Sequence, residues 1–529
     1  MSASARLRSF RPTARKLRLL PLLAGLPLAL SWSGSASASG ISAARFGGEH
    51  GHPTTDHVSA IYYNPAGIAL SEGTHIVIDT TTALRWASYD RPGVAPDVVN
   101  SQESLDLAPG ANDGKATLFN AILAPFAGVS TDFGTDFIYG GLAVYFPFGG
   151  SAVWDKNPTY TDNEQFPGAQ DGTQRWYSID GSLRSMYVTG ALAFNIRKIG
   201  LAIGVTGSAI KSNVTTIRAR NTNGSDDLLD PAGNLLEGRS YVDVDAWDAG
   251  FSVGAIYNVQ KKDKIWIGAS YTSQPGVVGG SKLTGTLDNA LGLAEPSQTQ
   301  VELLQTLPDI VRFGIRYRPI EKVELRLFGD YTRWSVFKNQ CLLDTSQEER
   351  NCDFPGLDNA LDDPSNFGAG AHPSVVQHLP RLWKDGGGVR AGVSYWFLPQ
   401  LEGYIGGGFD SSAVPVETLD PALMDMAKGT LSIGGKWQIN RRAAVSLTST
   451  QVFYKTTDTK GKNALNTFES PTRQPSADGT YRQFLQLFNV YVDVKFGFGE
   501  KKSLGKSNKK SEGDGDGDSG GAATLKVGS

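Results

Sequence analysis

The feature of this chain that most limits its fold is a two-residue alternation of apolar and polar side chains, repeated in fourteen segments. In the last segment, Phe488, Val490 and Val492 share one face, and Asn489 and Asp493 lie on the other. A period of two is that of a β-strand, whose successive side chains point to opposite faces. An apolar face opposite a polar one suits a strand between lipid and a wet lumen, but a soluble β-sandwich would show the same alternation.

The lengths of the connections separate these two folds. The fourteen segments are approximately 74–89, 116–129, 135–148, 183–196, 199–214, 242–258, 264–274, 309–318, 322–336, 387–397, 401–410, 428–439, 442–454 and 484–498. Short connections alternate strictly with long ones such as 149–182, 275–308 and 337–386. This regularity and the even strand number predict an all-β fold, a 14-stranded antiparallel transmembrane β-barrel with its short turns on the periplasmic side.

The N-terminus predicts export from the cytoplasm. Six basic residues between Arg6 and Arg18 precede an apolar run from Leu19 to Leu30, and Ala36-Ser37-Ala38 provides a small-x-small cleavage pattern. This arrangement is typical of a secretory signal peptide over residues 1–38. With the barrel, it places the mature chain as a multi-pass protein in the outer membrane of a Gram-negative bacterium.

Three further regions follow from the texture of the chain. Residues 39–73 lack alternation and precede the first strand, so we expect them to plug the lumen or to lie beneath it. Residues 74–499 form the predicted barrel. Residues 500–529 are rich in Lys, Asp and Gly, and we expect a disordered polar tail because such a composition cannot bury a core.

Charge and motifs exclude several functional classes. The chain has 50 Lys and Arg against 53 Asp and Glu, a net charge of −3, so it lacks the basic excess that nucleic-acid binding requires. It contains no nucleophile elbow, phosphate-binding loop or dinucleotide fingerprint, and we expect neither an enzyme nor a cofactor. His50, His52 and His57 with Asp56 could hold a metal, but histidines that are solvated or packed in the plug are favoured, so no metal site is predicted.

The two cysteines form a separate hypothesis. Cys341 and Cys352 are close in sequence, lie in a polar segment and belong to a chain predicted to be exported, which favours a disulfide that staples a loop. Two free thiols remain the alternative.

Several motifs resemble those of the FadL-type long-chain fatty acid transporters, a family that includes aromatic-hydrocarbon channels. Asn64-Pro65-Ala66-Gly67, preceded by Ile61-Tyr62-Tyr63, resembles the hatch motif of that family, and Phe146-Pro147-Phe148-Gly149 resembles its Pro-Phe-Gly motif. Other matching strings fall in family order and are Trp247-Asp248-Ala249-Gly250-Phe251, Leu307-Pro308, Asp330 to Phe337, Trp383-Lys384-Asp385 and Val414-Pro415. The resemblance covers about residues 39–498. It departs from the family in the polar residues after Phe498 and in the histidines of the N-terminal segment.

The resemblance implies an N-terminal hatch that plugs the barrel, capture of apolar ligands between extracellular loops, and release through a gap at a kinked third strand. The corresponding gating residues are Asn64, Pro65, Ala66 and Gly67. Gly140 and Gly141 could supply the kink of the third strand. The alternative for Asn64 to Gly67 is a structural turn with no role in gating.

Four arginines of the predicted strands, Arg312, Arg316, Arg326 and Arg390, should face the lumen, where a fatty acid carboxylate would need a cation. For any single arginine we favour the alternative, a salt bridge that fills the barrel. The function indicated is uptake of hydrophobic small molecules, most of all long-chain fatty acids, by a monomer in contact with outer-membrane lipid. Aromatic hydrocarbon uptake, a structural or adhesive barrel, and a membrane hydrolase that would need a Ser-His pair stay open as alternatives.

Overall fold

The computed structural model describes residues 45–93, 106–277, 280–354, 361–362 and 371–497. The predicted signal peptide and the predicted polar tail lie outside these residues.

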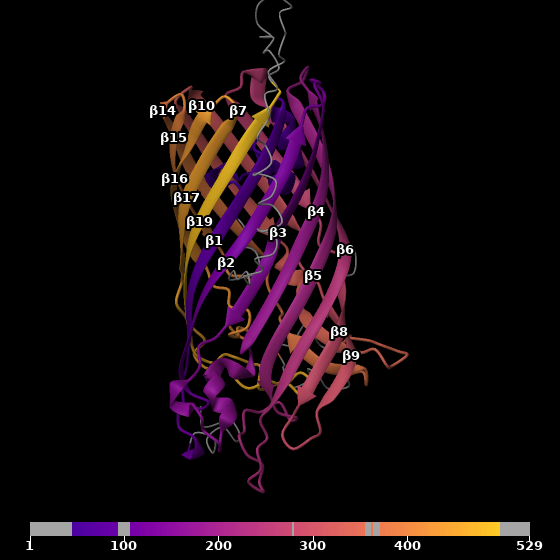
Figure 1. Cartoon of the computed structure of the whole chain (residues 1–529). Coiled ribbons are helices and arrows are strands. Elements are labelled where there is room, and N and C mark those ends of the chain that lie inside the picture. The colour runs from indigo at the N-terminus through magenta and orange to yellow at the C-terminus, as the bar shows by residue number, and fades with distance from the viewer. Residues whose placement is uncertain (1–44, 94–105, 278–279, 355–360, 363–370, 498–529) are drawn as a thin grey trace, which may run out of the picture.

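Among the described residues, fourteen antiparallel strands close into a barrel (Figure 1). These wall strands are β1 (Thr74–Arg91), β2 (Gly114–Thr131), β3 (Ile138–Val153), β4 (Asp180–Ile196), β5 (Leu201–Arg220), β6 (Gly238–Asn258), β7 (Ile265–Thr272), β10 (Ile310–Ile320), β11 (Val323–Thr332), β14 (Gly386–Leu398), β15 (Leu401–Asp410), β16 (Lys428–Asn440), β17 (Ala443–Tyr454) and β19 (Thr480–Phe496). Each pairs with its neighbours in the wall, and β1 pairs with β19 over seventeen positions from Thr74↔Phe496 to Asp90↔Thr480, which closes the ring. The predicted 14-stranded barrel is therefore confirmed.

The alternation of side chains follows from this closure. In β10, the inward-facing Arg312 and Arg316 are buried, whereas Phe313 and Ile315 are 58% and 44% exposed on the outside. Exposed apolar residues occur on every wall strand, so the barrel carries a continuous apolar band. Such a band around a polar interior is what a lipid bilayer requires of a barrel.

Aromatic side chains mark two edges of the band. Toward the long loops, at the lower end of Figure 1, Trp86 packs against Phe119 and Phe484 with ring centroids 5.1 and 5.8 Å apart. Toward the short turns, Phe137 packs against Phe194 with centroids 5.5 Å apart. Aromatic rings favour the membrane–water interface on both sides, so these pairs delimit the lipid-facing height of the wall.

The long loops hold strands that the sequence did not predict. They are β8 (Ser281–Ala290), β9 (Ser297–Gln305), β12 (Asn339–Asp344), β13 (Val375–Pro380) and the short β18 (Thr457–Asp458). Near the loop end, β6 pairs with β8 instead of β7, and the pairing continues through β9 and β12 to β13. We call these four strands, β8, β9, β12 and β13, the roof sheet. Its last strand, β13, contacts the loop after β17, where His378 Nδ1 lies 3.0 Å from Thr472 Oγ1.

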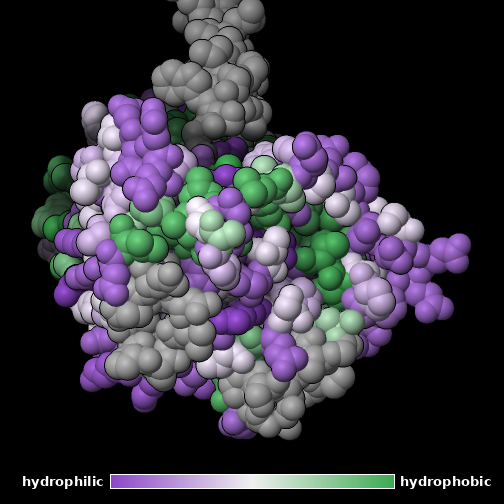
Figure 2. Space-filling model, turned by 90° about the horizontal axis from the view of Figure 1, so that it is seen from below, coloured by the Kyte–Doolittle hydropathy of each residue, from purple (hydrophilic) through white to green (hydrophobic). Residues whose placement is uncertain are grey.

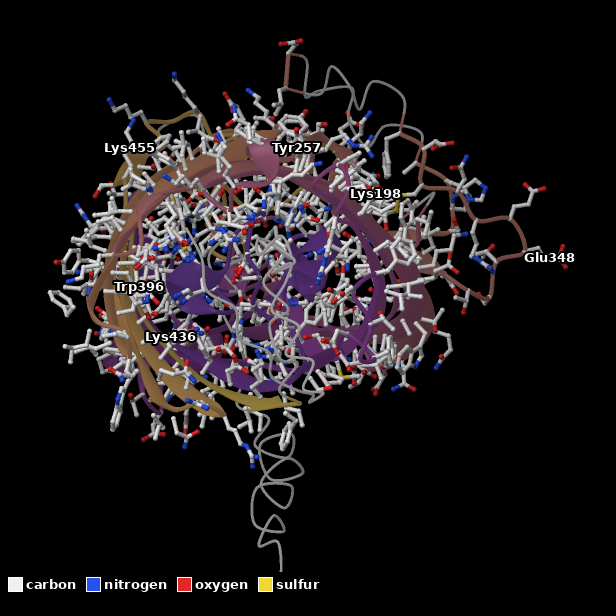
Figure 3. The ribbon with its side chains drawn as sticks, turned by 90° about the horizontal axis from the view of Figure 1, so that it is seen from above. Lys198, Tyr257, Glu348, Trp396, Lys436 and Lys455 are labelled. Carbon is white, nitrogen blue, oxygen red and sulfur yellow. A yellow bond between two sulfur atoms is a disulfide. The ribbon has the colours of Figure 1, made fainter. Side chains whose placement is uncertain are left out.

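The predicted disulfide between Cys341 and Cys352 is present at the base of a hairpin that leaves the roof sheet after β12. Glu348, near the tip, stands outside the ring of strands (Figure 3). Cys341 is completely buried among the roof strands, so the bridge ties an exposed loop to a packed sheet.

Helical segments are short. They are η1 (Gly48–His50), α3 (Ala60–Tyr63), η2 (Pro65–Leu70), η3 (Pro158–Tyr160), η4 (Pro167–Asp171), η5 (Thr173–Trp176), η6 (Val259–Lys261) and η7 (Trp334–Val336). None of the helices in the described part of the chain is both long and apolar enough to span a membrane. The first three belong to residues 45–73, which we call the N-terminal segment and which lies inside the ring when the barrel is viewed from the short-turn end (Figure 3).

We expect replacement of both cysteines by serine to loosen the hairpin without opening the wall. The bridge closes a loop of 11 residues, for which chain entropy predicts a constraint of about 3 kcal/mol. The hydrogen bonds of the wall lie elsewhere, so the variant should keep a heat-dependent shift of migration in SDS gels. Protease cleavage between residues 344 and 353 should become faster, with the reduced parent protein as the control. Loss of the heat-dependent shift would contradict this separation.

Candidate functional site

The Asn64-Pro65-Ala66-Gly67 motif forms the start of η2. Asn64 is extended and caps the helix, because its Oδ1 accepts a hydrogen bond from the backbone N–H of Ala66 at 3.1 Å, and Pro65 occupies the first helical position. Asparagine before a helix and proline at its first position both favour this local structure. The sequence of the motif therefore dictates its own turn.

Asn64 also joins the N-terminal segment to the wall. It is completely buried, and its Nδ2 donates to the carbonyl oxygens of Pro53 at 2.8 Å, Ala255 at 3.1 Å and Ala269 at 3.3 Å. Ala255 and Ala269 belong to the neighbouring strands β6 and β7. One side chain thus connects the segment with two wall strands.

The wall strands that contact the motif carry glycines at the points of contact. A Cβ added to Gly204 of β5 would lie 2.4 Å from the backbone nitrogen of Ala66, and one added to Gly254 of β6 would lie 2.1 Å from Oδ1 of Asn64. A Cβ on Gly67 would lie 2.1 Å from the carbonyl oxygen of Thr55. Glycine is required at these positions because the two backbones approach closely.

The helix η2, which begins with the motif, contacts mainly β4, β5 and β6, and it also contacts β3. Ile61, just before the motif, packs against Gly141 of β3, where an added Cβ would lie 2.9 Å from Ile61 Cδ1. The N-terminal segment therefore contacts β3 through Ile61 as well as through η2.

The irregularity of the third strand is not at the two glycines that the sequence suggested. Gly140 and Gly141 pair in regular register with Thr131 and Ser130 of β2. They also pair regularly with β4, and the register of β3 with β4 shifts further along, between Tyr145 and Phe148. The shift coincides with Phe146-Pro147, where proline cannot donate a hydrogen bond to a ladder.

A break in the wall begins at this shift. The last β2–β3 pair is Phe126↔Tyr145, and beyond it β2 from Gly114 to Pro125 pairs only with β1. The strands meet again near the loop end, where the N–H of Asp155 donates to the carbonyl oxygen of Thr117 at 2.9 Å. Between these two points the described strands share no ladder, and we call this stretch the wall gap.

Three of the four predicted lumen arginines have carboxylate partners. Arg316 Nη1 lies 3.2 Å from Asp56 of the N-terminal segment, and Arg326 Nη1 lies 3.2 Å from Glu324. Arg390 lies between two acids, Asp330 at 2.9 Å and Asp410. These arginines thus form salt bridges that fill the barrel.

Arg312 differs from the other three. Within the described part of the chain, no carboxylate forms an ion pair with it, although it is only 5% exposed. Its Nη1 donates to Thr272 Oγ1 at 2.9 Å, and its guanidinium lies 4.6 Å from the ring centre of Tyr62. Arg312 is therefore the predicted cation that remains free to receive an anion.

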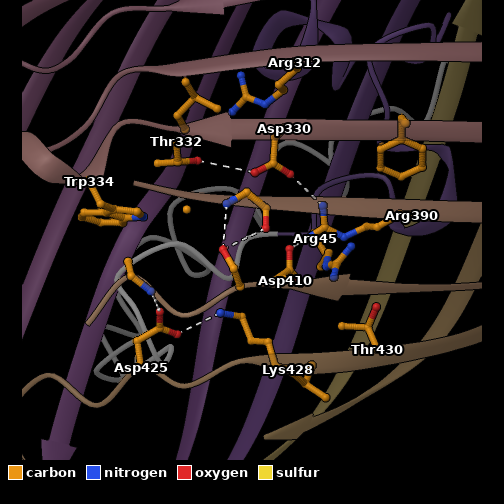
Figure 4. Close-up of a pocket in the computed structure, with 18 of the residues that line it drawn as sticks. Arg45, Arg312, Asp330, Thr332, Trp334, Arg390, Asp410, Asp425, Lys428 and Thr430 are labelled. Carbon is orange, nitrogen blue, oxygen red and sulfur yellow. Dashed lines mark hydrogen bonds and ion pairs between the residues drawn. The ribbon is translucent and has the colours of Figure 1, made fainter. Parts of the chain in front are cut away.

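Arg312 lines a central cavity beside the N-terminal segment, which contributes Tyr62 and Tyr63 to its lining (Figure 4). Arg390 with its two acids and the ion pair of Lys428 with Asp425, at 2.9 Å, face the same space. Arg45 also lines it. Lys428 and Arg45 were not predicted from the sequence, although Lys428 begins a predicted strand and the alternation of that strand places it on the inward face.

A second cavity, the outer chamber, is lined in part by the roof sheet, through Leu303, Leu342 and Leu379. Its apolar lining includes Leu183, Val214, Val242, Leu303, Leu342, Leu379, Leu423 and Met424. Three arginines also line it. Arg381 is paired with Asp420 at 2.6 Å, but Arg85 and Arg218 form no ion pair with any carboxylate that the structure describes, and both are buried. The chamber is thus apolar with a positive balance.

The outer chamber also touches the wall gap, because Gly150, Ser151 and Ala152 of β3 form part of its lining. Seen from the loop end, the molecule has a largely hydrophilic rim, with hydrophobic residues gathered toward the middle (Figure 2). An apolar cavity therefore lies between the loop surface and a break in the wall.

The histidines of the N-terminal segment are packing residues. His52 Nδ1 accepts from the N–H of Thr54 at 3.3 Å, and His57 Nδ1 accepts from the N–H of Ser59 at 3.2 Å. The ring of His57 lies 4.5 Å from that of Tyr491 in the wall. No group of three His, Cys, Asp or Glu in the described ranges is arranged to hold a metal ion.

The comparisons with known proteins agree with this architecture. The sequence model of the family described as outer membrane protein transport protein (OMPP1/FadL/TodX) matches residues 33–496. The fold is similar to that of a Pseudomonas aeruginosa FadL homologue, with a TM-score of 0.64 and 16% identity over 88% of this chain and 100% of the other.

It is also similar to two toluene transporters. TbuX of Ralstonia pickettii gives a TM-score of 0.53 and 14% identity over 87% of this chain and 99% of the other. TodX of Pseudomonas putida gives 0.53 and 13% over 87% and 96%. No curated protein matches the sequence. Identities this low show a common fold and no more.

We expect acid to loosen the N-terminal segment. Burial lowers the pKa of His57 from its ordinary 6.5 to about 3, and burial beside Arg326 and Arg316 also lowers the pKa of His52. A lowered pKa means that the packed segment binds fewer protons than the released one, so its stability is complete above pH 6.5 and falls as the pH drops from there toward 3. The expected slope is about 1.4 kcal/mol per pH unit for each histidine.

Hydrogen exchange of residues 45–73, corrected for intrinsic rates, measures this effect between pH 7.5 and 5. His57→Gln should show a shallower dependence because one of the titrating groups is gone. Equal slopes in the parent and the variant would rule His57 out as a cause.

Proposed function

The chain belongs to the outer membrane protein transport protein family (OMPP1/FadL/TodX), and on this premise we propose that it takes up long-chain fatty acids and releases them sideways through the wall gap. The observation that carries the proposal is the contact between the apolar outer chamber and the gap, at Gly150 to Ala152. A hydrophobic molecule in that chamber has a short path to lipid. The wall strands and the apolar band of the family fold serve to hold this path in the outer membrane of a Gram-negative cell.

The charge of the cavities favours an acid over a neutral ligand. Arg312 in the central cavity and Arg218 in the outer chamber are buried, and neither is ion-paired among the described residues. A buried cation without an anion is costly, and a carboxylate forms strong, charge-assisted hydrogen bonds with guanidinium. An apolar chain with one carboxylate fits both the lining and the charge.

The N-terminal segment supports the role of a hatch in this proposal. It contacts β3 through Ile61 and is joined to β6 and β7 by Asn64. It also lies beside the central cavity, which is lined by Tyr62 and Tyr63. A change in the packing of the segment would therefore be felt both at the cavity and at the third strand.

A second candidate cargo is a neutral aromatic hydrocarbon. Phe46, Tyr62, Phe126 and Tyr145 form a ring cluster between the N-terminal segment and the wall, with centroids 5.3 to 5.7 Å apart. Tyr187 extends it at 5.5 Å from Tyr145. Aromatic rings attract one another beyond their buried area, so this cluster could accept a monoaromatic ligand.

Arg312→Gln should separate the two cargoes. We expect it to weaken binding of a long-chain fatty acid by roughly 10- to 100-fold, the range for a lost hydrogen bond to a charged group. Binding of the methyl ester and of toluene should not change. Arg312→Lys, which keeps the cation, should fall between the parent and Arg312→Gln. Calorimetry on the detergent-solubilised barrel measures all three ligands, and tight toluene binding without fatty acid binding would favour the second candidate.

Asn64→Ala tests the hatch. It removes three donated hydrogen bonds and the helix cap, but none of the wall ladder. We expect normal assembly and impaired uptake of a fluorescent fatty acid, with uptake normalised to the heat-modifiable fraction. Asn213→Ala, at a half-buried position of β5 that does not contact the motif, is the matched control. Normal normalised uptake in Asn64→Ala would leave the motif as a structural turn.

A further inference from the structure

Side chains bridge the wall gap where the backbone ladder is missing. Arg85 of β1 and Asn120 of β2 both donate to the carbonyl oxygen of Ser151 in β3, at 3.4 Å from Nη1 and 3.0 Å from Nδ2. Thr117 Oγ1 donates to Asp155 Oδ2 at 2.6 Å at the loop end of the gap. The two strands are therefore held together here by side chains that can exchange partners.

Of the three residues whose side chains bridge the gap, Arg85, Asn120 and Thr117, only Arg85 also lines the outer chamber, together with Ser151. Its side chain is 4% exposed, and its Nε donates to Gln483 Oε1 at 2.9 Å. Among the described residues it has no ion pair. Its known partners are thus neutral oxygens of an amide side chain and a backbone carbonyl.

A carboxylate competes well for such a guanidinium. The bond from Arg85 to Ser151 is long at 3.4 Å, whereas a charge-assisted N–H···O bond to a carboxylate is typically ~2.7–2.9 Å and about twice as strong as a neutral one. An anionic head group in the chamber would draw Arg85 toward itself and away from Ser151.

The edges of the gap suit an apolar tail. Leu118 and Ile122 of β2 face inward and are buried, while Phe119 and Leu123 face outward and are 53% and 37% exposed. Phe119 belongs to the aromatic edge of the apolar band beside Trp86. The part of the gap between Phe119 and the last β2–β3 pair therefore opens into the lipid-facing height of the wall, in its half nearer the long loops.

We propose that Arg85 is a ligand-operated latch: a carboxylate bound in the outer chamber takes its guanidinium from Ser151, which removes one of the side-chain bonds across the wall gap and lets the gap widen for lateral exit. This inference rests on the proposed function. It adds a residue that couples recognition of the acid to opening. Asn120 bonds the same carbonyl but is uncharged and is not part of the chamber lining, so it holds the strands without sensing the ligand.

The test measures the width of the gap directly. Spin labels on Ala121→Cys of β2 and Val153→Cys of β3 flank it, and the two native cysteines are occupied by their disulfide. Palmitate should increase the distance between the labels by about one strand spacing, ~5 Å. Methyl palmitate, which has the same tail without the charge, should leave the distance unchanged. An equal response to both ligands, or to neither while palmitate binds, would overturn the latch.

Variants in the same labelled background identify the residue. Arg85→Gln should abolish the response to palmitate, and Arg85→Lys should retain it. Asn120→Ala should keep an acid-specific response from a wider starting distance. A full palmitate response in Arg85→Gln would overturn the proposal. If Arg85→Gln does not assemble, the comparison of palmitate with its ester in the parent still decides.

Palmitate binding is measured on the same samples by calorimetry. Binding without a change of distance refutes the latch and leaves the proposed function standing. Absence of palmitate binding refutes both, because the latch requires that ligand.

Discussion

The architecture depends on one constraint, that backbone N–H and C=O groups facing lipid must be hydrogen-bonded within the protein. Thirteen of the fourteen junctions between wall strands follow this rule with ladders, including the closure of β1 on β19. The junction of β2 with β3 departs from it over part of its length, and proline occurs on both strands there, at Pro125 and Pro147. Fewer donors are left to satisfy, and Arg85 and Asn120 supply side-chain bonds to a β3 carbonyl. At this break, side-chain hydrogen bonds take the place of part of the missing backbone ladder.

The interior is organised by charge as much as by packing. Inward-facing arginines are matched by acids from other parts of the chain, such as Asp56 with Arg316 and Asp420 with Arg381. Cations without such partners in the described residues line the two cavities, Arg312 in one and Arg85 and Arg218 in the other. A buried arginine with a carboxylate partner is already neutralised, whereas a buried arginine without one is stabilised by an added anion. The lumen therefore contains salt bridges that fill space and, at the two cavities, cations that can bind an anion.

The wall could be predicted from the sequence because alternation and loop length report directly on a closed barrel. The inward direction of Arg312 and Arg316 followed from the same period of two. The partner of Arg316 could not be predicted, since Asp56 lies 260 residues away and only the closed barrel brings them together. The roof strands were missed because their alternation is short, and they gain their order by pairing in series from β8, which alone of the four pairs with β6. The irregularity of β3 was expected at Gly140 and Gly141, but Pro147, a residue that cannot donate to a ladder, was the stronger local signal.

The surface on which the N-terminal segment docks is shared by three wall strands, β5, β6 and β7. Asn64 donates to carbonyls on both β6 and β7, and its motif rests against Gly204 of β5. No single strand offers this surface, so it comes into being only when the three strands are aligned side by side. The segment precedes these strands in the chain, and its partners on β6 and β7 lie some two hundred positions later. A segment early in the sequence in this way depends on strands far along the chain for the surface on which it docks.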